Sequence, residues 1–189
     1  WYINSCNSVK YLFPRAHATA YVMMAFRIAY CKVHYPLAFY ATYYTIRATG
    51  FDPLLAVQGI DAIRDKYWEI SERLEKREPV TSVEKDTMNN LEVCYEMYLR
   101  GFSFLPPDIY RSEVKEFVIE GNSLRIPFTS IANFGEQAAR DIVAERAKKR
   151  FSSVEDMMLR CPKVSKSVVA ALELHGALSD MPKTEQLTI

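Results

Sequence analysis

The sequence lacks the features that mark metal-stabilised, secreted or membrane-spanning proteins. Its four cysteines are far apart and form no C-x-x-C pair, so they predict neither a structural zinc site nor a disulfide framework and favour reduced, buried thiols. The most apolar stretch, residues 18–31, is too short to cross a bilayer and contains Arg27, and the first residues do not resemble a signal peptide. We therefore expect a cytoplasmic protein without membrane association.

The net charge of the chain is also small. The 189 residues carry a formal net charge of +1, which is too small for the field of the whole molecule to steer phosphates. Any binding of nucleic acid must then come from a local patch. With 49% hydrophobic and 25% charged residues, the composition is that of a globular protein with one sizeable core or two small ones. The apolar start at Trp1, without an initiator Met, predicts a piece of a longer protein.

Residues 16–47 have a helical pattern with apolar side chains on most faces. A helix that is apolar all round is expected to be buried. Pro36 disfavours helical geometry at Tyr35, so the pattern predicts two helices that meet there. The density of aromatic residues in the second helix is first of all a sign of packing.

Further helices are predicted up to residue 101. Asp52 is a suitable N-cap and Pro53 suits a first helical position, so a third helix is expected from there towards Arg77. The alternating acids and bases of residues 69–78 indicate a solvated helix face. A further helix over residues 84–100 is predicted to end at Gly101.

The composition changes after Gly101. Residues 117–119 and 124–126 have the pattern of strands, and the Gly-Asn turn between them predicts a small β-hairpin. Beyond Ile131 the pattern is one of short helices with tight turns. The fold class is therefore expected to be mainly α.

Four parts are predicted along the chain. They are a helical part over residues 1–101, a connecting β-hairpin segment over 102–130, a compact helical module over 131–180 and a tail over 181–189. The boundary between the two larger parts is expected within residues 101–128.

Residues 130–143 match the helix-hairpin-helix pattern, in which an apolar residue and a tight turn ending in Gly precede a helix. The hairpin here is formed by Asn133, Phe134 and Gly135. A glycine lets the backbone approach a phosphate closely, and the free N–H groups of the following helix N-terminus carry partial positive charge. Asn133 departs from the pattern, since Pro or Gly is commoner at its position.

A second copy follows about thirty residues later, with Ser153 as the cap of its first helix. This copy lacks the glycine and offers Lys163, Ser165 and Lys166 to a DNA backbone, beside the basic cluster of residues 146–150. Two adjacent hairpins are expected to hold both strands of a duplex through phosphates, without sequence preference. The alternative is that these helix pairs serve only as packing units.

A separate group of candidate site residues lies within residues 11–21, where Arg15, His17 and Tyr21 are at the start of a predicted helix. His17 and Tyr21 are four residues apart and share a helix face. A cation and hydrogen-bonding groups at a helix start suit a triphosphate or a nucleic-acid backbone. The alternative is that His17 is a capped or core histidine that binds no ligand.

The segments WYINSC, KYLFPRAHATAYVMMAFRIAYCKVHYPLAFYATYYTIRA and RGFSFLPPDIYRSEVKEFVIEGNSLRIPF resemble the C-terminal end of the PolC-type DNA polymerase III alpha subunit family. The resemblance implies that the first fifty or so residues are the end of the fingers subdomain, with Arg15, His17 and Tyr21 near the incoming deoxynucleotide. The family's chemistry is Mg²⁺-dependent phosphoryl transfer by palm aspartates. Those aspartates are expected upstream, so this chain is predicted to contain no catalytic residue or metal ligand and to be inactive alone.

The tail also resembles the family's sliding-clamp motif. Gln186, Leu187 and Ile189 match its glutamine and aliphatic positions, while the closing aromatic residue is missing. The alternative is an ordinary frayed terminus. The implied partners are duplex DNA, the incoming dNTP, the sliding clamp and other subunits of the DNA polymerase III holoenzyme.

Two further hypotheses compete with a polymerase segment. A non-enzymatic DNA-binding or scaffold protein would also carry helix-hairpin-helix units, and a purely helical interaction domain would need no DNA at all. Residues 13–21 discriminate between them, because a scaffold has no reason to place a basic and aromatic group at the head of an apolar helix.

Overall fold

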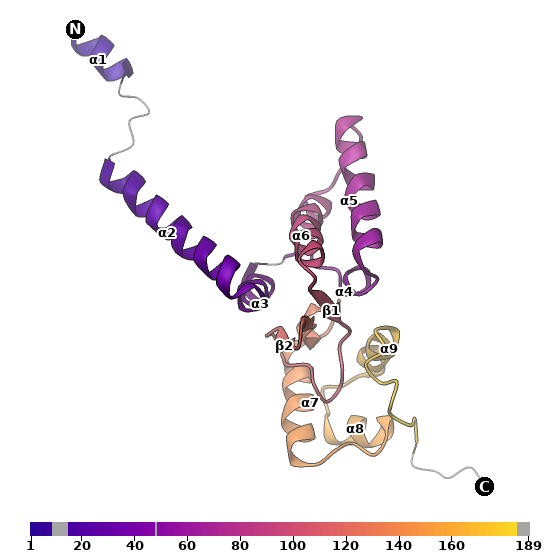
Figure 1. Cartoon of the computed structure of the whole chain (residues 1–189). Coiled ribbons are helices and arrows are strands. Elements are labelled where there is room, and N and C mark those ends of the chain that lie inside the picture. The colour runs from indigo at the N-terminus through magenta and orange to yellow at the C-terminus, as the bar shows by residue number, and fades with distance from the viewer. Residues whose placement is uncertain (9–14, 48, 185–189) are drawn as a thin grey trace. The chain divides into compact units, whose positions relative to one another are not determined.

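The apolar stretch after Arg15 folds as two helices that meet at Tyr35, as predicted. In the computed structural model, which describes residues 1–8, 15–47 and 49–184, α2 spans Arg15–His34 and α3 spans Pro36–Arg47. A short helix, α1 (Tyr2–Ser8), precedes them (Figure 1). The chain forms two compact units, Trp1–Phe39 and Tyr40–Ile189.

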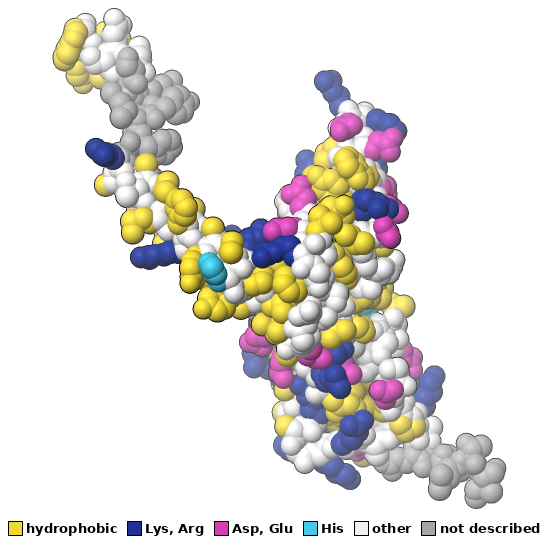
Figure 2. All heavy atoms as spheres, in the orientation of Figure 1, with side chains coloured by type: hydrophobic (Ala, Val, Ile, Leu, Met, Phe, Trp, Pro, Cys, Tyr) yellow, Lys and Arg dark blue, Asp and Glu magenta, His cyan; other side chains and the backbone are white. Residues whose placement is uncertain are grey.

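The prediction that the first long helix is buried is wrong. No residue of α2 is buried, and eight of its large apolar side chains are 52–72% exposed. They are Tyr21, Val22, Met23, Met24, Phe26, Ile28, Tyr30 and Val33. Figure 2 shows hydrophobic side chains at the surface of this helix. The described part of the first unit contains only α1, α2 and the start of α3, too few elements to surround a helix.

The second unit continues with three helices, α4 (Pro53–Ala56), α5 (Ile60–Glu75) and α6 (Ser82–Leu99). The predicted N-cap is confirmed, because the Asp52 carboxylate accepts hydrogen bonds from the backbone N–H groups of Leu54 and Leu55. The single helix expected from there is interrupted by a turn at Gly59, whose φ of 100° favours glycine.

Helices α5 and α6 pack against each other (Figure 1). At the start of α6, the Thr81 hydroxyl accepts from the Glu84 backbone N–H while the Glu84 carboxylate accepts from the Thr81 N–H, a capping box. Hydrogen bonds to the Glu84 carboxylate, first from Arg73 of α5 and then from the backbone N–H and hydroxyl of Thr81, lower the pKa of Glu84 to about 2. The charges of residues 69–78 mostly lie at the surface, as predicted.

Aromatic rings form the core that joins α3 to the segments after it. The rings of Tyr44, Phe51, Phe104 and Phe117 lie with centroids 5.0–6.2 Å apart. The Tyr44 hydroxyl donates to the buried Cys94 sulfur over 3.3 Å. The aromatic residues at this end of α3 are thus packing residues.

A three-stranded sheet follows, with β1 (Ser103–Leu105), β2 (Val118–Glu120) and β3 (Ser123–Arg125) in the order β1-β3-β2. The antiparallel pair β2–β3 is the predicted hairpin. The parallel pairing of β1 with β3 was not predicted.

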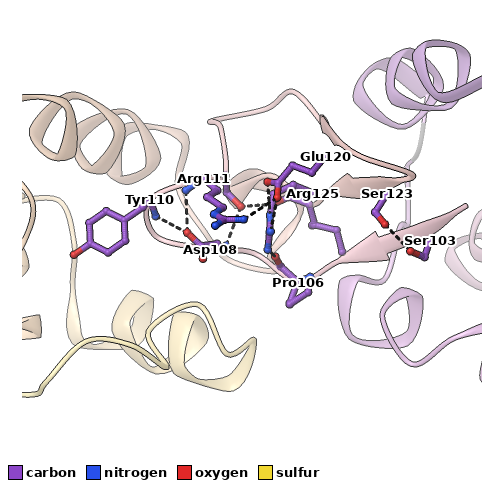
Figure 3. A network of polar contacts seen from close by, with 10 residues as sticks. Ser103, Pro106, Asp108, Tyr110, Arg111, Glu120, Ser123 and Arg125 are labelled. Atoms are coloured by element: carbon purple, nitrogen blue, oxygen red, sulfur yellow. Dashed lines mark hydrogen bonds and ion pairs between the residues drawn. The ribbon is translucent and has the colours of Figure 1, made fainter. Parts of the chain in front are cut away.

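A polar network holds the loop between β1 and β2 against the hairpin (Figure 3). The buried guanidinium of Arg125 donates two hydrogen bonds to Glu120, of 2.8 and 2.7 Å, and one of 2.9 Å to the Pro106 carbonyl. Asp108 accepts from the backbone N–H groups of Tyr110 and Arg111. These bonds fix the path of the chain towards residues 112–115.

The remaining elements are a 3₁₀ turn, η1 (Phe128–Ser130), and the helices α7 (Glu136–Lys148), α8 (Val154–Arg160) and α9 (Lys166–Leu174). Their apolar faces meet in one core. The mainly α fold class is confirmed. The division into four parts stays a prediction. The two compact units divide at another place, between residues 39 and 40.

Candidate nucleic-acid interface

The first predicted hairpin lies between η1 and α7. Ile131 and Phe134 are buried, and the Phe134 N–H donates to the Ile131 carbonyl over 3.1 Å, closing a tight turn. Asn133 is exposed at its tip with a φ of 60°, and Gly135 is the N-cap of α7. Two apolar anchors therefore hold an exposed turn in front of a helix N-terminus.

The second hairpin lies between α8 and α9 and has the same construction. Cys161 and Val164 are buried, and the Val164 N–H donates to the Cys161 carbonyl over 2.9 Å. Lys163 is exposed between them. Ser165, also exposed, is the N-cap of α9, and its hydroxyl accepts from the Val168 N–H over 3.4 Å.

The two hairpins correspond residue by residue, with Ile131 equivalent to Cys161 and Gly135 equivalent to Ser165. The first helical hydrogen bond recurs as well, from the Ala139 N–H to the Gly135 carbonyl (3.2 Å) and from the Val169 N–H to the Ser165 carbonyl (3.0 Å). Both helix N-termini are thus presented in the same way. The sequence indicated two copies, but their register becomes visible only when buried and exposed positions are aligned.

The left-handed residue of the first turn is Asn133 and not the glycine. Asparagine is among the few residues other than glycine that tolerate this conformation, which explains the departure from the usual pattern. Gly135 has an ordinary φ of −68°, and a Cβ at this position would meet nothing within 4 Å. Packing among the described residues therefore does not require glycine at position 135.

The second hairpin is the more basic of the two. Lys163 and Lys166 are both exposed beside Ser165, and the first turn of α9 contains no acidic residue. The side chains of Ser165 and Ser167 lie 2.8 Å apart, oxygen to oxygen. The predicted residues of this hairpin therefore face solvent together.

One cation of the basic cluster at residues 146–150, Arg146, is committed to the fold, whereas Lys148, Lys149 and Arg150 are exposed. The Arg146 guanidinium donates to the Ile109 and Ser112 carbonyls and pairs with Glu113, and its side chain is 10% exposed. Burial lowers the pKa of Arg146. Arg150 stacks on Tyr110 at 4.0 Å. The prediction of an available cluster beside the second hairpin is therefore wrong for Arg146.

Of the predicted nucleotide-contacting residues, the structure brings two together. The rings of His17 and Tyr21 lie edge to face with centroids 4.5 Å apart on an exposed face of α2. Arg15 is the first residue of the same helix and is exposed. Because residues two positions apart on a helix do not face each other, Arg15 does not share that face.

The predicted clamp-contacting residues Gln186, Leu187 and Ile189 lie outside the described residues.

Among the residues that the structure describes, no three His, Cys, Asp or Glu side chains are grouped to hold a metal ion. Cys94 and Cys161 are buried, as expected, and burial raises the pKa of the Cys94 thiol to about 12. Cys6 and Cys31, in contrast, are exposed. The described helices include none long and apolar enough to cross a membrane.

The repeated hairpins define a tandem helix-hairpin-helix module, and residues 101–187 match a family model described as a helix-hairpin-helix motif. Over all of its length the chain is 51% identical to a PolC-type DNA polymerase III of Thermotoga maritima, of which it covers 14%. It is also 47% and 45% identical, over its full length, to the PolC-type enzymes of Halalkalibacterium halodurans and Clostridium perfringens, covering 13% of each. The chain spans about one seventh of the length of these curated relatives, and its identity to them over its full length confirms the resemblance to the PolC-type family.

Proposed function

We propose that this chain binds duplex DNA without sequence preference, through the N-termini of α7 and α9. The observation that carries the proposal is the repetition of one turn, with the same hydrogen bonds, in front of both helices. Each N-terminus offers unpaired N–H groups and partial positive charge to a phosphate. Two such sites, equivalent in register, suit the two strands of one duplex.

The chemistry of the site favours the DNA backbone over the bases. The exposed groups at the second hairpin are ammonium and hydroxyl groups, which hydrogen-bond phosphate oxygens. The first hairpin offers backbone N–H groups beside Gly135, where a side chain would obstruct close approach. Contacts of this kind position a protein on DNA and carry no sequence information.

A salt titration tests this proposal. The affinity of the chain for a short duplex is measured by fluorescence anisotropy over a range of salt concentrations. Each lost phosphate contact reduces the slope of log K against log salt by about 0.9, so replacing Lys163 and Lys166 by Ala should reduce it by about 2. The control replaces Lys66 and Lys76, which pair with glutamates on α5, and should leave the slope unchanged. Equal slopes for both double variants would overturn the proposal.

We propose further that the longer protein is a DNA-directed DNA polymerase that acts in DNA replication. The identity to PolC-type enzymes over the whole chain supports this. The Mg²⁺ ions and the catalytic aspartates of such an enzyme would lie in another part of the protein, and the chain by itself should not extend a primer in the presence of Mg²⁺. Primer extension by the isolated chain would contradict the proposal.

Within that enzyme, Arg15, His17 and Tyr21 are proposed to contact the incoming dNTP. Their exposure on α2 in the isolated chain supports this, because a covered surface could not receive a ligand. In the full-length polymerase, Arg15→Ala should raise the apparent KM for dNTP several-fold more than it weakens DNA binding. Arg27→Ala, at an exposed arginine of the same helix, is the control. If the Arg15 variant loses only stability, the arginine is structural.

The tail residues Gln186, Leu187 and Ile189 are proposed to bind the sliding clamp, next to other subunits of the DNA polymerase III holoenzyme in the cytoplasm. A short apolar peptide with one glutamine can bury its aliphatic side chains in a pocket on such a partner. Replacing Leu187 and Ile189 by Ala in the full-length enzyme should weaken clamp binding by at least ten-fold while primer extension without the clamp is unchanged. An unchanged clamp affinity would exclude this role.

A further inference from the structure

The two hairpins are equivalent in backbone but not in charge. Asn133 takes the position of Lys163, and Glu136 takes the position of Lys166, so the first hairpin has a neutral residue and an acid where the second has two lysines. An uncompensated carboxylate at the first turn of α7 would repel a phosphate. If both hairpins bind DNA, the first needs a cation from elsewhere in the chain.

Lys115, from the loop that precedes β2, supplies that cation. Its Nζ lies 2.6 Å from the Oε2 atom of Glu136, and the Lys115 side chain is 51% exposed. The other oxygen of Glu136 pairs with Arg140 at 2.6 Å. The three side chains together carry one net positive charge, at the N-terminus of the helix that follows the first hairpin.

The fold holds Lys115 in this place. The backbone N–H groups of Phe128 and Thr129 donate to the carbonyls of Glu113 and Val114, each over 3.1 Å, and so tie the loop to η1. Arg146 pairs with Glu113 over 2.9 Å and anchors the same loop to α7. The position of Lys115 beside the hairpin therefore does not depend on its own ion pair.

An independent observation lies next to this lysine. A hollow of about 290 Å³ opens there, and Lys115 lines it together with the hydroxyl residues Thr129 and Ser130, which directly precede the first hairpin. The remaining lining residues come from α3 and the turn after it, namely Tyr44, Thr45, Gly50 and Phe51. An ammonium group and two hydroxyl groups around a hollow suit an anionic group of the size of a phosphate.

We propose that the DNA-binding surface of the first hairpin extends into this hollow and that Lys115 is its phosphate-binding cation, with Thr129 and Ser130 as hydrogen-bonding neighbours. The inference rests on the proposed binding of duplex DNA. Lys115 then takes the role at the first hairpin that Lys163 and Lys166 take at the second. The hydrogen bonds from Lys115 and Arg140 lower the pKa of Glu136, so this carboxylate is ionised at neutral pH and keeps Lys115 oriented.

The test is the same salt titration on the whole chain with three variants at this site. Lys115→Ala should weaken binding to a short duplex roughly ten-fold at about 50 mM salt and reduce the salt slope by about 0.9. Lys115→Arg should restore both values. Lys66→Ala is the matched control, since Lys66 also pairs with a glutamate, at 2.9 Å, but on α5. Thermal melting of each variant checks that the fold is intact.

The double variant Lys115→Ala with Glu136→Gln separates two roles. If Lys115 acts only by neutralising Glu136, the double variant regains the affinity and slope of the original chain, and the inference is overturned. If Lys115 contacts phosphate, the slope stays reduced by about 0.9.

The inference and the proposed function fail in different ways. An unchanged slope in Lys115→Ala, with the expected loss in the Lys163 and Lys166 double variant, overturns the inference alone. If the Lys163 and Lys166 double variant also keeps its slope, the proposed binding site itself is wrong.

Discussion

The ion pair between Glu120 and Arg125 gives the sharpest prediction about stability (Figure 3). The Arg125 side chain is 9% exposed and that of Glu120 is 22% exposed, and two hydrogen bonds join them. Glu120→Gln removes the charge that compensates a buried guanidinium. Breaking a fully buried pair costs about 3–5 kcal/mol, and because glutamine keeps one acceptor and the site is partly hydrated, we expect about 2–3 kcal/mol here.

Chemical denaturation measures this loss. In the second compact unit, Tyr40–Ile189, a loss of about 2–3 kcal/mol corresponds to a decrease in Tm of roughly 4–12 °C. The matched control is Glu69→Gln, because the pair of Glu69 with Lys66 is exposed on both sides and should contribute less than about 0.5 kcal/mol. A Glu120→Gln variant as stable as the control would refute the reasoning.

The pH dependence gives a second readout of the same pair. The hydrogen bond from Arg125 lowers the pKa of Glu120 in the folded state. The stabilisation is therefore complete above the pKa of the unfolded chain, about 4.3, and is lost as pH falls through the lower folded-state pKa. The difference in stability between the original chain and Glu120→Gln should be constant at neutral pH and shrink in acid. A difference that grows in acid would contradict this assignment.

Two predictions concern the hairpins themselves. Asn133→Val places a β-branched residue at a φ of 60° and should lower the free energy of unfolding in denaturant by about 1–2 kcal/mol. Asn133→Gly should not destabilise the chain. Equal losses in the two variants would show that the turn does not need this conformation. Ser165→Ala removes the cap of α9 and should cost about 1 kcal/mol, against a few tenths for Ser165→Gly. A Ser165→Ala variant as stable as the original chain would show that the hydroxyl is not the cap.

Local signals in the sequence predicted much of the fold. Asp52 with Pro53 begins a helix, Gly101 follows the end of α6, and the Gly-Asn turn closes the β2–β3 hairpin, because each depends on residues a few positions apart. The interruption at Gly59 was missed. A single glycine within a helical pattern is often tolerated, and only the observed φ of 100° shows that the chain turns there.

Features that depend on distant contacts escaped sequence reasoning. The parallel pairing of β1 with β3 joins strands separated by residues 106–122, which include β2. Arg146 has the sequence context of an exposed cation, and its burial against Ile109 and Ser112 is set by the tertiary fold. Lys115 carries no local motif, and its link to the first hairpin is visible only through Glu136. The exposure of α2 likewise reflects what surrounds the helix and not its own pattern.

The central claim is that both hairpins hold one duplex through their helix N-termini. The most direct test follows the backbone amide signals of the chain by NMR as a short duplex is added. The signals of Glu136 and Gln137 in α7, and those of Lys166 and Ser167 in α9, should shift together and to the same extent for two duplexes of unrelated sequence. Shifts confined to one hairpin, or shifts that depend on the sequence of the duplex, would contradict the account.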